Sequence, residues 1–414
     1  MADIKFTPDQ LLAINTEGCD LLVSAAAGSG KTAVLTRRVL NKIIDSEKKC
    51  DITDFLVVTF TISAAADLKR KLSDGIREEM KREGADVSRL RRQLLSLSYA
   101  KIATIDSFCL FIVKDCLSEL SLPVGMSIGD ASEMDALALE IMEETVERFY
   151  SNSEDNGFLT LAETFSDARG DSALTPKLLE IYRHLINFPC PMELLGEDIA
   201  ALRQVSKLRG KGSVFSSPVF SPIYTDITEK ISQACEFWRE GIKACELDED
   251  AMIKYLPVLE EDLRFAEALG AAAEKSYSDF RRVLDAFAPA KMPAIRGRSD
   301  DEELVLIKKL RSTAKDIIVS LKEEYAVKNE DELFLQVDLH VKILEAINLV
   351  ITEFHSRFME EKRRRRIMSF SDMSHYAFEA LIEKGSYNRK TGEFRKTPYA
   401  ESLSSRFSEI LIDE

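Results

Sequence analysis

Four short runs of apolar residues along the chain have the pattern of buried strands. They lie at residues 21–23, 55–60, 101–104 and 410–412. Each of the first three is followed by a stretch in which apolar positions have helical spacing. Strands that alternate with helices in this way predict a parallel sheet with crossover helices on its faces, which is an α/β fold.

The middle of the chain has a different pattern, because its apolar spacing is almost wholly helical. The longest predicted helices lie at 132–150, 256–287 and 341–366. Two loops rich in glycine, proline and serine, at 209–218 and 289–298, interrupt this region. We therefore predict an α/β domain that is interrupted by a large, mainly α-helical segment.

The distribution of charge supports this division. The net charge is −15, but residues 1–120 hold 18 basic and 17 acidic side chains and are nearly neutral. Residues 121–361 hold 27 basic and 46 acidic side chains, whereas residues 362–408 hold 11 and 5. Because the acidity belongs to the middle of the chain, the total charge does not exclude a nucleic-acid partner.

Length and composition limit the class of protein. At 414 residues with 45% hydrophobic content, the chain is long enough for two or more domains. It has no apolar stretch of about 18 residues and no signal peptide, so we expect a cytoplasmic protein with no membrane partner. Seven scattered cysteines and four distant histidines predict reduced thiols and no structural metal.

The strongest chemical signal is the segment between the first predicted strand and the helix after it. It consists of Ala25, Ala26, Ala27, Gly28, Ser29, Gly30, Lys31 and Thr32. Backbone N–H groups of such a P-loop cradle phosphate at a helix N-terminus. Lys31 would reach the β- and γ-phosphates of ATP, and the Thr32 hydroxyl would bind Mg²⁺. Lysine and threonine directly after the loop argue against a simple strand–helix turn, although Ala25 replaces the usual glycine.

Two carboxylates follow the last predicted strand. Asp413 would bind Mg²⁺ through its water shell, and Glu414 would accept a proton from the attacking water. A polar chain end after a core strand is the alternative interpretation of so short a motif. The P-loop elsewhere in the chain favours the catalytic interpretation.

A helix is predicted to begin near the N-terminus, with Thr7 as its N-cap and Pro8 at its first position. Gln10 follows, and a glutamine amide can pair with both the donor and the acceptor of an adenine edge. Taken alone, Gln10 fits an ordinary solvent-facing helix residue better.

Together these segments resemble superfamily 1 helicases of the UvrD/Rep type, and within them the RecB-like AddA group. Gln10 is similar to the Q motif, residues 25–32 to motif I, and residues 59–66 to motif Ia. Residues 104–109 are similar to motif Ib, and Asp413 with Glu414 to the first half of motif II. The similarity to AddA depends mainly on residues 104–109 and 370–373.

The resemblance implies how the chain is divided. A RecA-like P-loop domain would consist of residues 1–125 plus 350–414, and a helical insertion domain would cover 126–349. ATP and Mg²⁺ would be the cofactors.

The resemblance also implies a set of DNA-binding residues. They are Phe60, Thr61, Ser63, Thr104 and Ser107. Phe60 would stack on a base of single-stranded DNA, and the hydroxyls would contact phosphates. A core aromatic on a buried strand is an almost equally good interpretation of Phe60. We expect Asp106 to cap a helix.

The activity implied is that of an ATP-dependent DNA helicase and translocase in double-strand break repair and recombination. It would act on single- and double-stranded DNA, with an exonuclease activity and an AddB-like partner protein. Motifs III to VI and a nuclease domain are missing, so we expect an N-terminal fragment that hydrolyses ATP very slowly by itself. The alternatives are a UvrD/Rep-type repair helicase without nuclease, a non-catalytic P-loop DNA-binding module, and a P-loop enzyme that phosphorylates a small molecule.

Five consecutive basic residues, 362–366, close a predicted helix. Basic side chains at a helix C-terminus favour the macrodipole and lie in solvent, and we prefer this interpretation. Contact with the DNA backbone is a secondary possibility for them. Ser369 is predicted to be the N-cap of the next helix.

Overall fold

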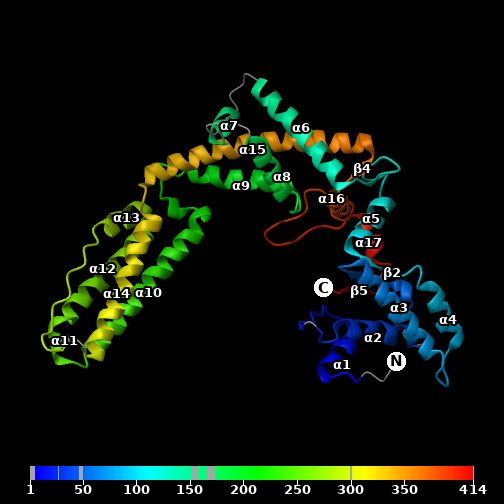
Figure 1. The fold of residues 1–414 in the computed structure, drawn as a ribbon, viewed down its shortest axis with the longest axis horizontal. Helices are drawn as coiled ribbons and strands as arrows, with labels where there is room; N and C mark the ends of the chain where they lie inside the picture. Colours follow the sequence, from blue (N-terminus) through cyan, green and yellow to red (C-terminus); the bar gives the residue numbers. More distant parts are fainter. Residues whose placement is uncertain are drawn as a thin grey trace. The chain divides into compact units, whose positions relative to one another are not determined.

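A computed structural model describes residues 5–26, 28–45, 50–151, 157–165, 173–298 and 301–413. The chain divides into two compact units (Figure 1). Unit 1 consists of Met1–Ala138, Ile186–Pro189 and Ser356–Glu414, and unit 2 of Leu139–Leu185 and Cys190–His355. Two helices have residues in both units, α6 (Ala131–Ser151) and α15 (Glu330–Arg365).

A parallel sheet of three strands lies at the centre of unit 1. Its strands are β1 (Phe55–Thr59), β2 (Lys101–Thr104) and β5 (Glu409–Asp413), in the order β2-β1-β5. In the register of the sheet, Thr59 is paired with Thr104 on one side and with Asp413 on the other. The three strands therefore end together, and their last residues form the carboxyl edge of the sheet.

Among the described residues, helices of unit 1 form two larger cores and a small one at Ala13, Ile14 and Val34. The first contains α2 (Lys31–Ile44), α3 (Ile62–Glu79) and α4 (Val87–Ser96), which pack against side chains of β1 and β2. The second contains α5 (Ile105–Asp115), α16 (Phe370–Leu381) and α17 (Pro398–Ser404). Helices follow β1 and β2 directly, as crossover connections require. The predicted α/β fold with a parallel sheet is confirmed.

Short elements complete unit 1. They are α1 (Pro8–Asn15), the 3-10 turn η1 (Ile52–Asp54), and the paired strands β3 (Ser127–Ile128) and β4 (Ile367–Met368).

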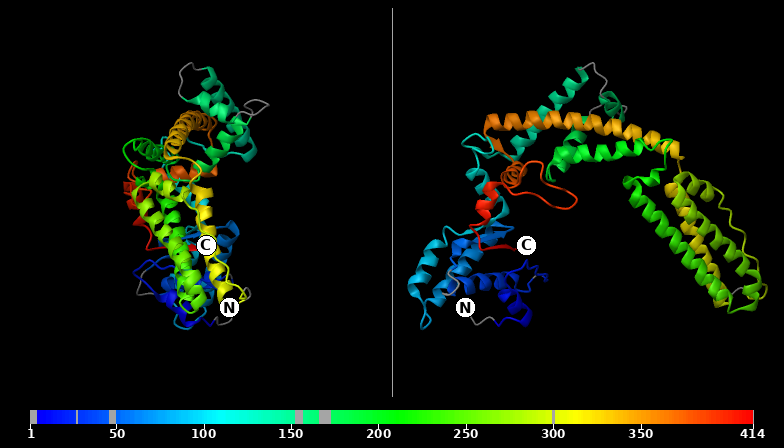
Figure 2. Two further views of the ribbon diagram at one scale, coloured as in Figure 1. Left: turned by 90° about the vertical axis from the view of Figure 1, so that its left-hand side faces the viewer. Right: turned by 180° about the vertical axis from the view of Figure 1, so that it is seen from behind.

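Unit 2 is helical in its described part. Apart from residues of α6 and α15, its elements are α7 (Phe158–Phe165), α8 (Leu174–Leu185), α9 (Pro191–Ser206), η2 (Val214–Ser216), η3 (Pro218–Phe220), α10 (Ser221–Cys245), α11 (Glu249–Lys254), α12 (Leu256–Lys275), α13 (Tyr277–Asp285) and α14 (Glu302–Tyr325). Helix α10 runs beside α12 and α14 in every view (Figures 1 and 2). The fully buried side chains of Trp238, Tyr255 and Phe280 lie in the core of these helices.

The predicted helix at 256–287 is in fact two helices. Helix α12 ends at Lys275, and the Ser276 hydroxyl accepts a hydrogen bond from Asp279 N–H to cap α13. The helical spacing of apolar residues continues across the break, so it predicted a single helix. Ser276, a residue that favours the N-cap position, was the signal in the sequence for a second helix start.

The strand predicted at 21–23 is wrong. These residues are coil, and Leu22 is 94% exposed. A continuous apolar run forms a strand in a parallel sheet where both faces are covered. Among the described residues β5 pairs only with β1, and Ile410 and Ile412 on one of its faces are 56% and 71% exposed. In the described part of the chain, this face of β5 is therefore too exposed to bury a further apolar strand beside it.

Within the described ranges, no helix combines the length and the apolar character that crossing a membrane requires.

Candidate nucleotide-binding site

Two glycines in the loop before α2 have a left-handed backbone conformation. Gly28 and Gly30 have φ angles of 79° and 88°. These lie in the left-handed region, which is strained for residues that have a side chain. Gly30 is the N-cap of α2, and a Cβ added to it would lie 3.3 Å from Gln10 Nε2. The free N–H groups of the first turn of α2 therefore begin at this loop. Ala27 lies outside the described residues.

Lys31 places a positive charge at the same point. Its Nζ donates hydrogen bonds to the carbonyl oxygens of Ala25 at 2.7 Å and Ala26 at 3.2 Å. A cation at a helix N-terminus is unfavourable to the macrodipole, and an anion there is favourable. Loop, helix and ammonium group thus all favour a bound anion.

Thr32 and Asp413 meet although 381 positions separate them in the sequence. The Thr32 hydroxyl donates to Asp413 Oδ2 at 3.3 Å. Thr32 stands in the first turn of α2, and Asp413 is the last residue of β5. The two residues predicted to bind Mg²⁺ are therefore adjacent at the carboxyl edge of the sheet. Glu414 lies outside the described residues.

Gln10 is connected to the loop. Its Nε2 donates to the carbonyl oxygen of Ser29 at 2.9 Å, and its Oε1 accepts from Thr7 N–H at 2.9 Å. The Thr7 hydroxyl accepts from Gln10 N–H in return, so the two residues form a capping box at the start of α1. The predicted N-cap Thr7 and first-turn Pro8 are confirmed. Gln10 is half-buried and joins α1 to the loop, unlike an ordinary solvent-facing residue.

Side chains after β1 and β2 lie on the same edge of the sheet. Phe60 is 76% exposed, so its interpretation as a core aromatic is wrong. Thr61 and Ser63 are exposed at the start of α3, and Thr61 is its N-cap. These three residues are available to a ligand at the carboxyl edge.

Thr104 is the last residue of β2, and Ser107 lies in the first turn of α5. Thr104 is buried, and its hydroxyl lies 2.8 Å from the Ser107 hydroxyl and accepts from Ser107 N–H at 3.2 Å. Thr104 is therefore the N-cap of α5, and the prediction that Asp106 caps this helix is wrong. Asp106 stands inside the first turn, where its charge favours the helix dipole.

The basic run at 362–366 is not a uniform solvent-facing cluster, because Lys362 is buried whereas the four arginines after it are exposed. Contact of these arginines with the DNA backbone stays a prediction. Lys362 is 2% exposed and forms an ion pair with Asp372, and burial lowers its pKa against the opposing effect of that carboxylate. Arg364 and Arg365 form ion pairs with Glu361, and their hydrogen bonds lower the pKa of Glu361 to about 2. The preferred solvent interpretation is therefore wrong for Lys362. Spacing alone could not show this, because the five letters are all basic.

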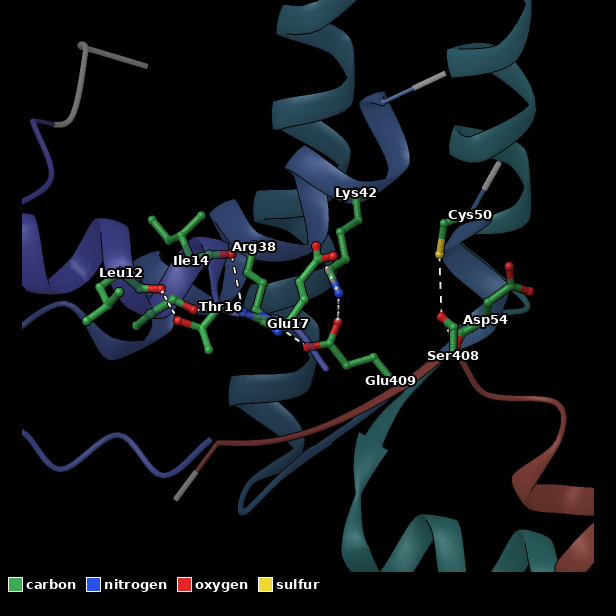
Figure 3. A network of polar contacts seen from close by, with 11 residues as sticks. Leu12, Ile14, Thr16, Glu17, Arg38, Lys42, Cys50, Asp54, Ser408 and Glu409 are labelled. Atoms are coloured by element: carbon green, nitrogen blue, oxygen red, sulfur yellow. Dashed lines mark hydrogen bonds and ion pairs between the residues drawn. The ribbon is translucent and has the colours of Figure 1, made fainter. Parts of the chain in front are cut away.

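The structure contains a cluster that sequence reasoning missed (Figure 3). Glu409 at the start of β5 forms ion pairs with Arg38 and Lys42 of α2, both at 2.5 Å. Arg38 is 8% exposed and stands four positions after Val34, within the apolar side of α2. An arginine in an apolar stripe was the only signal in the sequence.

Comparison with known proteins assigns the chain to a family. A family model described as the UvrD/REP helicase N-terminal domain matches residues 6–414. The chain belongs to the UvrD/REP helicase family. The predicted resemblance to this family is confirmed, and the match contains both the loop before α2 and the end of β5.

Three curated relatives share one name, which describes each as the A subunit of an ATP-dependent helicase/nuclease. The chain is 29% identical to the protein from Clostridium perfringens (strain 13 / Type A) over 414 residues. It is 28% identical to the protein from Listeria monocytogenes serotype 4b over 411 residues, and 30% identical to that from Bacillus cytotoxicus over 413. Each alignment covers 99% of this chain and 32% of the relative. The chain therefore spans about a third of the length of these relatives.

Proposed function

We propose that the chain binds ATP with Mg²⁺ and forms the nucleotide-binding part of an ATP-dependent DNA helicase. The observation that carries this proposal is the 3.3 Å contact between the Thr32 hydroxyl and the Asp413 carboxylate. Lys31 and the first turn of α2 lie beside that contact, so an anion site and a pair of oxygen ligands adjoin each other. Membership of the UvrD/REP family supports the same function.

The residues present fit both cofactors. Hydroxyl and carboxylate oxygens are the ligands that Mg²⁺ prefers, and Thr32 and Asp413 would supply them. A Cβ at Gly28 would meet open space within 4 Å, so a phosphate can approach the backbone there. When bound, Mg²⁺ would neutralise charge on the phosphates. Glu414 remains the proposed general base from the sequence.

The chain's own groups would hold the nucleotide. Lys31 would exchange its contacts with the carbonyls of Ala25 and Ala26 for phosphate oxygens, a stronger charge-assisted contact. Gln10 can pair with an adenine edge without losing its present contacts. Its Nε2 has a second hydrogen and its Oε1 a second lone pair beyond those used by Ser29 and Thr7.

DNA would bind along the rest of the carboxyl edge. Phe60 would stack on an unpaired base, and the donors at the start of α3 and α5 would contact phosphates. Thr61, Ser63, Thr104 and Ser107 remain the proposed donors. The hydroxyls of Thr61 and Thr104 act as acceptors when they cap their helices, so the Thr61 O–H can still donate to a phosphate, whereas the N–H groups of Ala64 and Ser107 are already used.

The division of the chain and its larger assembly are part of the proposal. Residues 1–125 plus 350–414 would form a RecA-like domain, and 126–349 a helical insertion domain. The relatives are named as the A subunit of a helicase/nuclease, which supports a role in double-strand break repair, an exonuclease activity and an AddB-like partner for the whole protein.

Binding of a fluorescent ATP analogue in the presence of Mg²⁺ tests the proposal. Lys31→Ala should weaken binding about tenfold or more, because it removes a charge-assisted contact with phosphate. Lys81→Ala is the control, since Lys81 forms an exposed ion pair with Glu78 on the surface. Equal affinities for wild type and Lys31→Ala would favour a non-catalytic module. Nucleotide binding without any binding of single-stranded DNA would favour an enzyme acting on a small molecule.

A further inference from the structure

Helix α2 and strand β5 make contact at both of their ends. At one end, the Thr32 hydroxyl meets the Asp413 carboxylate. At the other, Glu409 uses each carboxylate oxygen for a different cation of α2: Oε1 for Arg38 Nε and Oε2 for Lys42 Nζ. Leu411, between the two acids, packs into the core that contains α2. Residues 409, 411 and 413, which are alternate residues of β5, thus all face α2.

The two ends are satisfied together in the observed register. Glu409 and Asp413 are four positions apart on the strand, a length of roughly 13 Å. On α2, Arg38 and Lys42 follow Thr32 by six and ten residues, which is roughly 9 and 15 Å along the helix axis. The acid pair on the strand therefore matches the spacing of its partners on the helix.

Arg38 also connects this pair of elements to α1. Its Nη1 donates to the carbonyl oxygen of Ile14 at 3.2 Å (Figure 3). The same nitrogen donates to the carbonyl oxygen of Ala13 at 2.7 Å. These carbonyls belong to the last turn of α1, where no intrahelical donor reaches them. Because α1 begins with the capping box of Gln10, one buried guanidinium joins the helix that bears Gln10 to the strand that bears Asp413.

We propose that Arg38, Lys42 and Glu409 form a positioning cluster that holds Asp413 beside Thr32 by fixing the register of β5 against α2. This inference rests on the proposed nucleotide and Mg²⁺ site. No member of the cluster is a catalytic residue, and its effect on the site is carried by the backbone of β5. A purely stabilising ion pair would change the free energy of unfolding and leave the Mg²⁺ dependence of nucleotide binding unaltered.

The decisive variant is Glu409→Gln, which keeps the size of the side chain and removes its charge. The measurement is the Mg²⁺ concentration that gives half of the Mg²⁺-dependent increase in affinity for a fluorescent ATP analogue. We expect this concentration to rise about tenfold, the size of effect that residues orienting metal ligands have. Affinity without Mg²⁺ should stay within about twofold of wild type, since Lys31 and the loop are untouched.

Two further variants make the test secure. Lys42 is half-buried, and Lys42→Gln removes one of the two cations that contact Glu409. We expect the Mg²⁺ concentration for the half-maximal increase in affinity to rise about threefold, less than in Glu409→Gln. Lys42→Gln serves as the measurement if Glu409→Gln fails to fold, as judged by far-ultraviolet circular dichroism. Glu78→Gln is the control, because it breaks an exposed ion pair on α3 and should leave the Mg²⁺ dependence unchanged.

The possible failures are distinguishable. A wild-type chain that shows no Mg²⁺-dependent nucleotide binding overturns the proposed function, and this inference with it. The other outcome is that the wild-type chain binds nucleotide in an Mg²⁺-dependent way, and a folded Glu409→Gln or Lys42→Gln variant has the same Mg²⁺ dependence as wild type. That outcome overturns the inference alone.

Discussion

Lys362 and Asp372 form a buried ion pair that joins the last turn of α15 to the first turn of α16. Lys362 Nζ donates to both carboxylate oxygens, at 2.6 and 2.7 Å. Asp372 also accepts from Ser369 N–H at 2.7 Å, in a capping box that confirms Ser369 as an N-cap. The carboxylate is thus shared between a cation and a helix terminus, and both side chains of the ion pair are buried.

We expect Lys362→Met to destabilise unit 1 by about 3–5 kcal/mol, because the Asp372 carboxylate would stay buried without its cation. Hydrogen exchange of the amides in α16 measures the effect where the pair acts. Combining it with Asp372→Asn should restore much of the loss, since asparagine is neutral and still accepts the cap. Arg364→Met, at an arginine that is 72% exposed, should cost no more than about 1 kcal/mol. Similar losses in the two single variants would contradict the buried pairing.

Tyr277 makes the free energy of unfolding of unit 2 depend on pH in the alkaline range. Its hydroxyl lies 2.7 Å from the carbonyl oxygens of both Tyr325 and Lys328, and burial raises its pKa to about 12. The neutral hydroxyl is therefore favoured by folding. Its contribution is complete below pH 10, the ordinary tyrosine pKa, and is lost as the pH rises towards 12.

Tyr277→Phe should destabilise unit 2 by about 1–2 kcal/mol at pH 8, because two buried carbonyls lose a donor. At pH 11 the difference from wild type should be smaller by about 1 kcal/mol. Denaturant unfolding followed by the fluorescence of Trp238, the single tryptophan and a fully buried residue of unit 2, measures both values. A difference that stays constant between pH 8 and pH 11 would show that the hydroxyl ionises as freely as in the unfolded chain.

Phe60 should matter for DNA and not for stability. Phe60→Ala is expected to weaken binding of single-stranded DNA by about 1–3 kcal/mol, the value of one base stacked on an aromatic ring. Its free energy of unfolding should change by less than about 0.5 kcal/mol, because the ring is 76% exposed. Fluorescence anisotropy of a labelled oligonucleotide measures the affinity.

Tyr99→Ala is the matched control for that experiment. Tyr99 is an aromatic residue of similar exposure, 78%, but it precedes β2 and so stands at the opposite, amino edge of the sheet. Equal weakening by both variants would mean that exposed aromatics bind DNA without regard to the carboxyl edge.

Patterns that depend on near neighbours could be read from the sequence. Residues 55–59 and 101–104 form strands, as predicted apart from Phe60, because the sheet buries all of the first run and alternate residues of the second. Thr7 and Ser369 cap helices because a hydroxyl accepts from an N–H three residues later, which is a local contact. The adjacency of Thr32 and Asp413 was predicted by pairing a P-loop with an acid at the end of a strand, and it holds although residues 21–23 are coil.

Contacts that depend on distant partners could not be read in this way. Lys362 is a charged residue among charged residues, and only the position of Asp372 on the next helix explains its burial. Glu409 reads as the polar start of a strand, and its two cations are more than 360 positions away. The segment 21–23 failed for a related reason: three apolar letters carry no periodicity, and whether they pair depends on the cover of β5.

The register of the sheet has a consequence for which changes the chain can accept. Successive side chains of a strand point to opposite faces, so a slip of β5 by one residue would turn Asp413 away from α2 and present Ile412 to it. Inserting or deleting one residue between Glu409 and Asp413 would therefore remove the carboxylate from Thr32 without altering any residue of the site. Spacing within β5 is as strict a requirement as the identity of its two acids, whereas the loop after α16 can change in length without shifting that spacing.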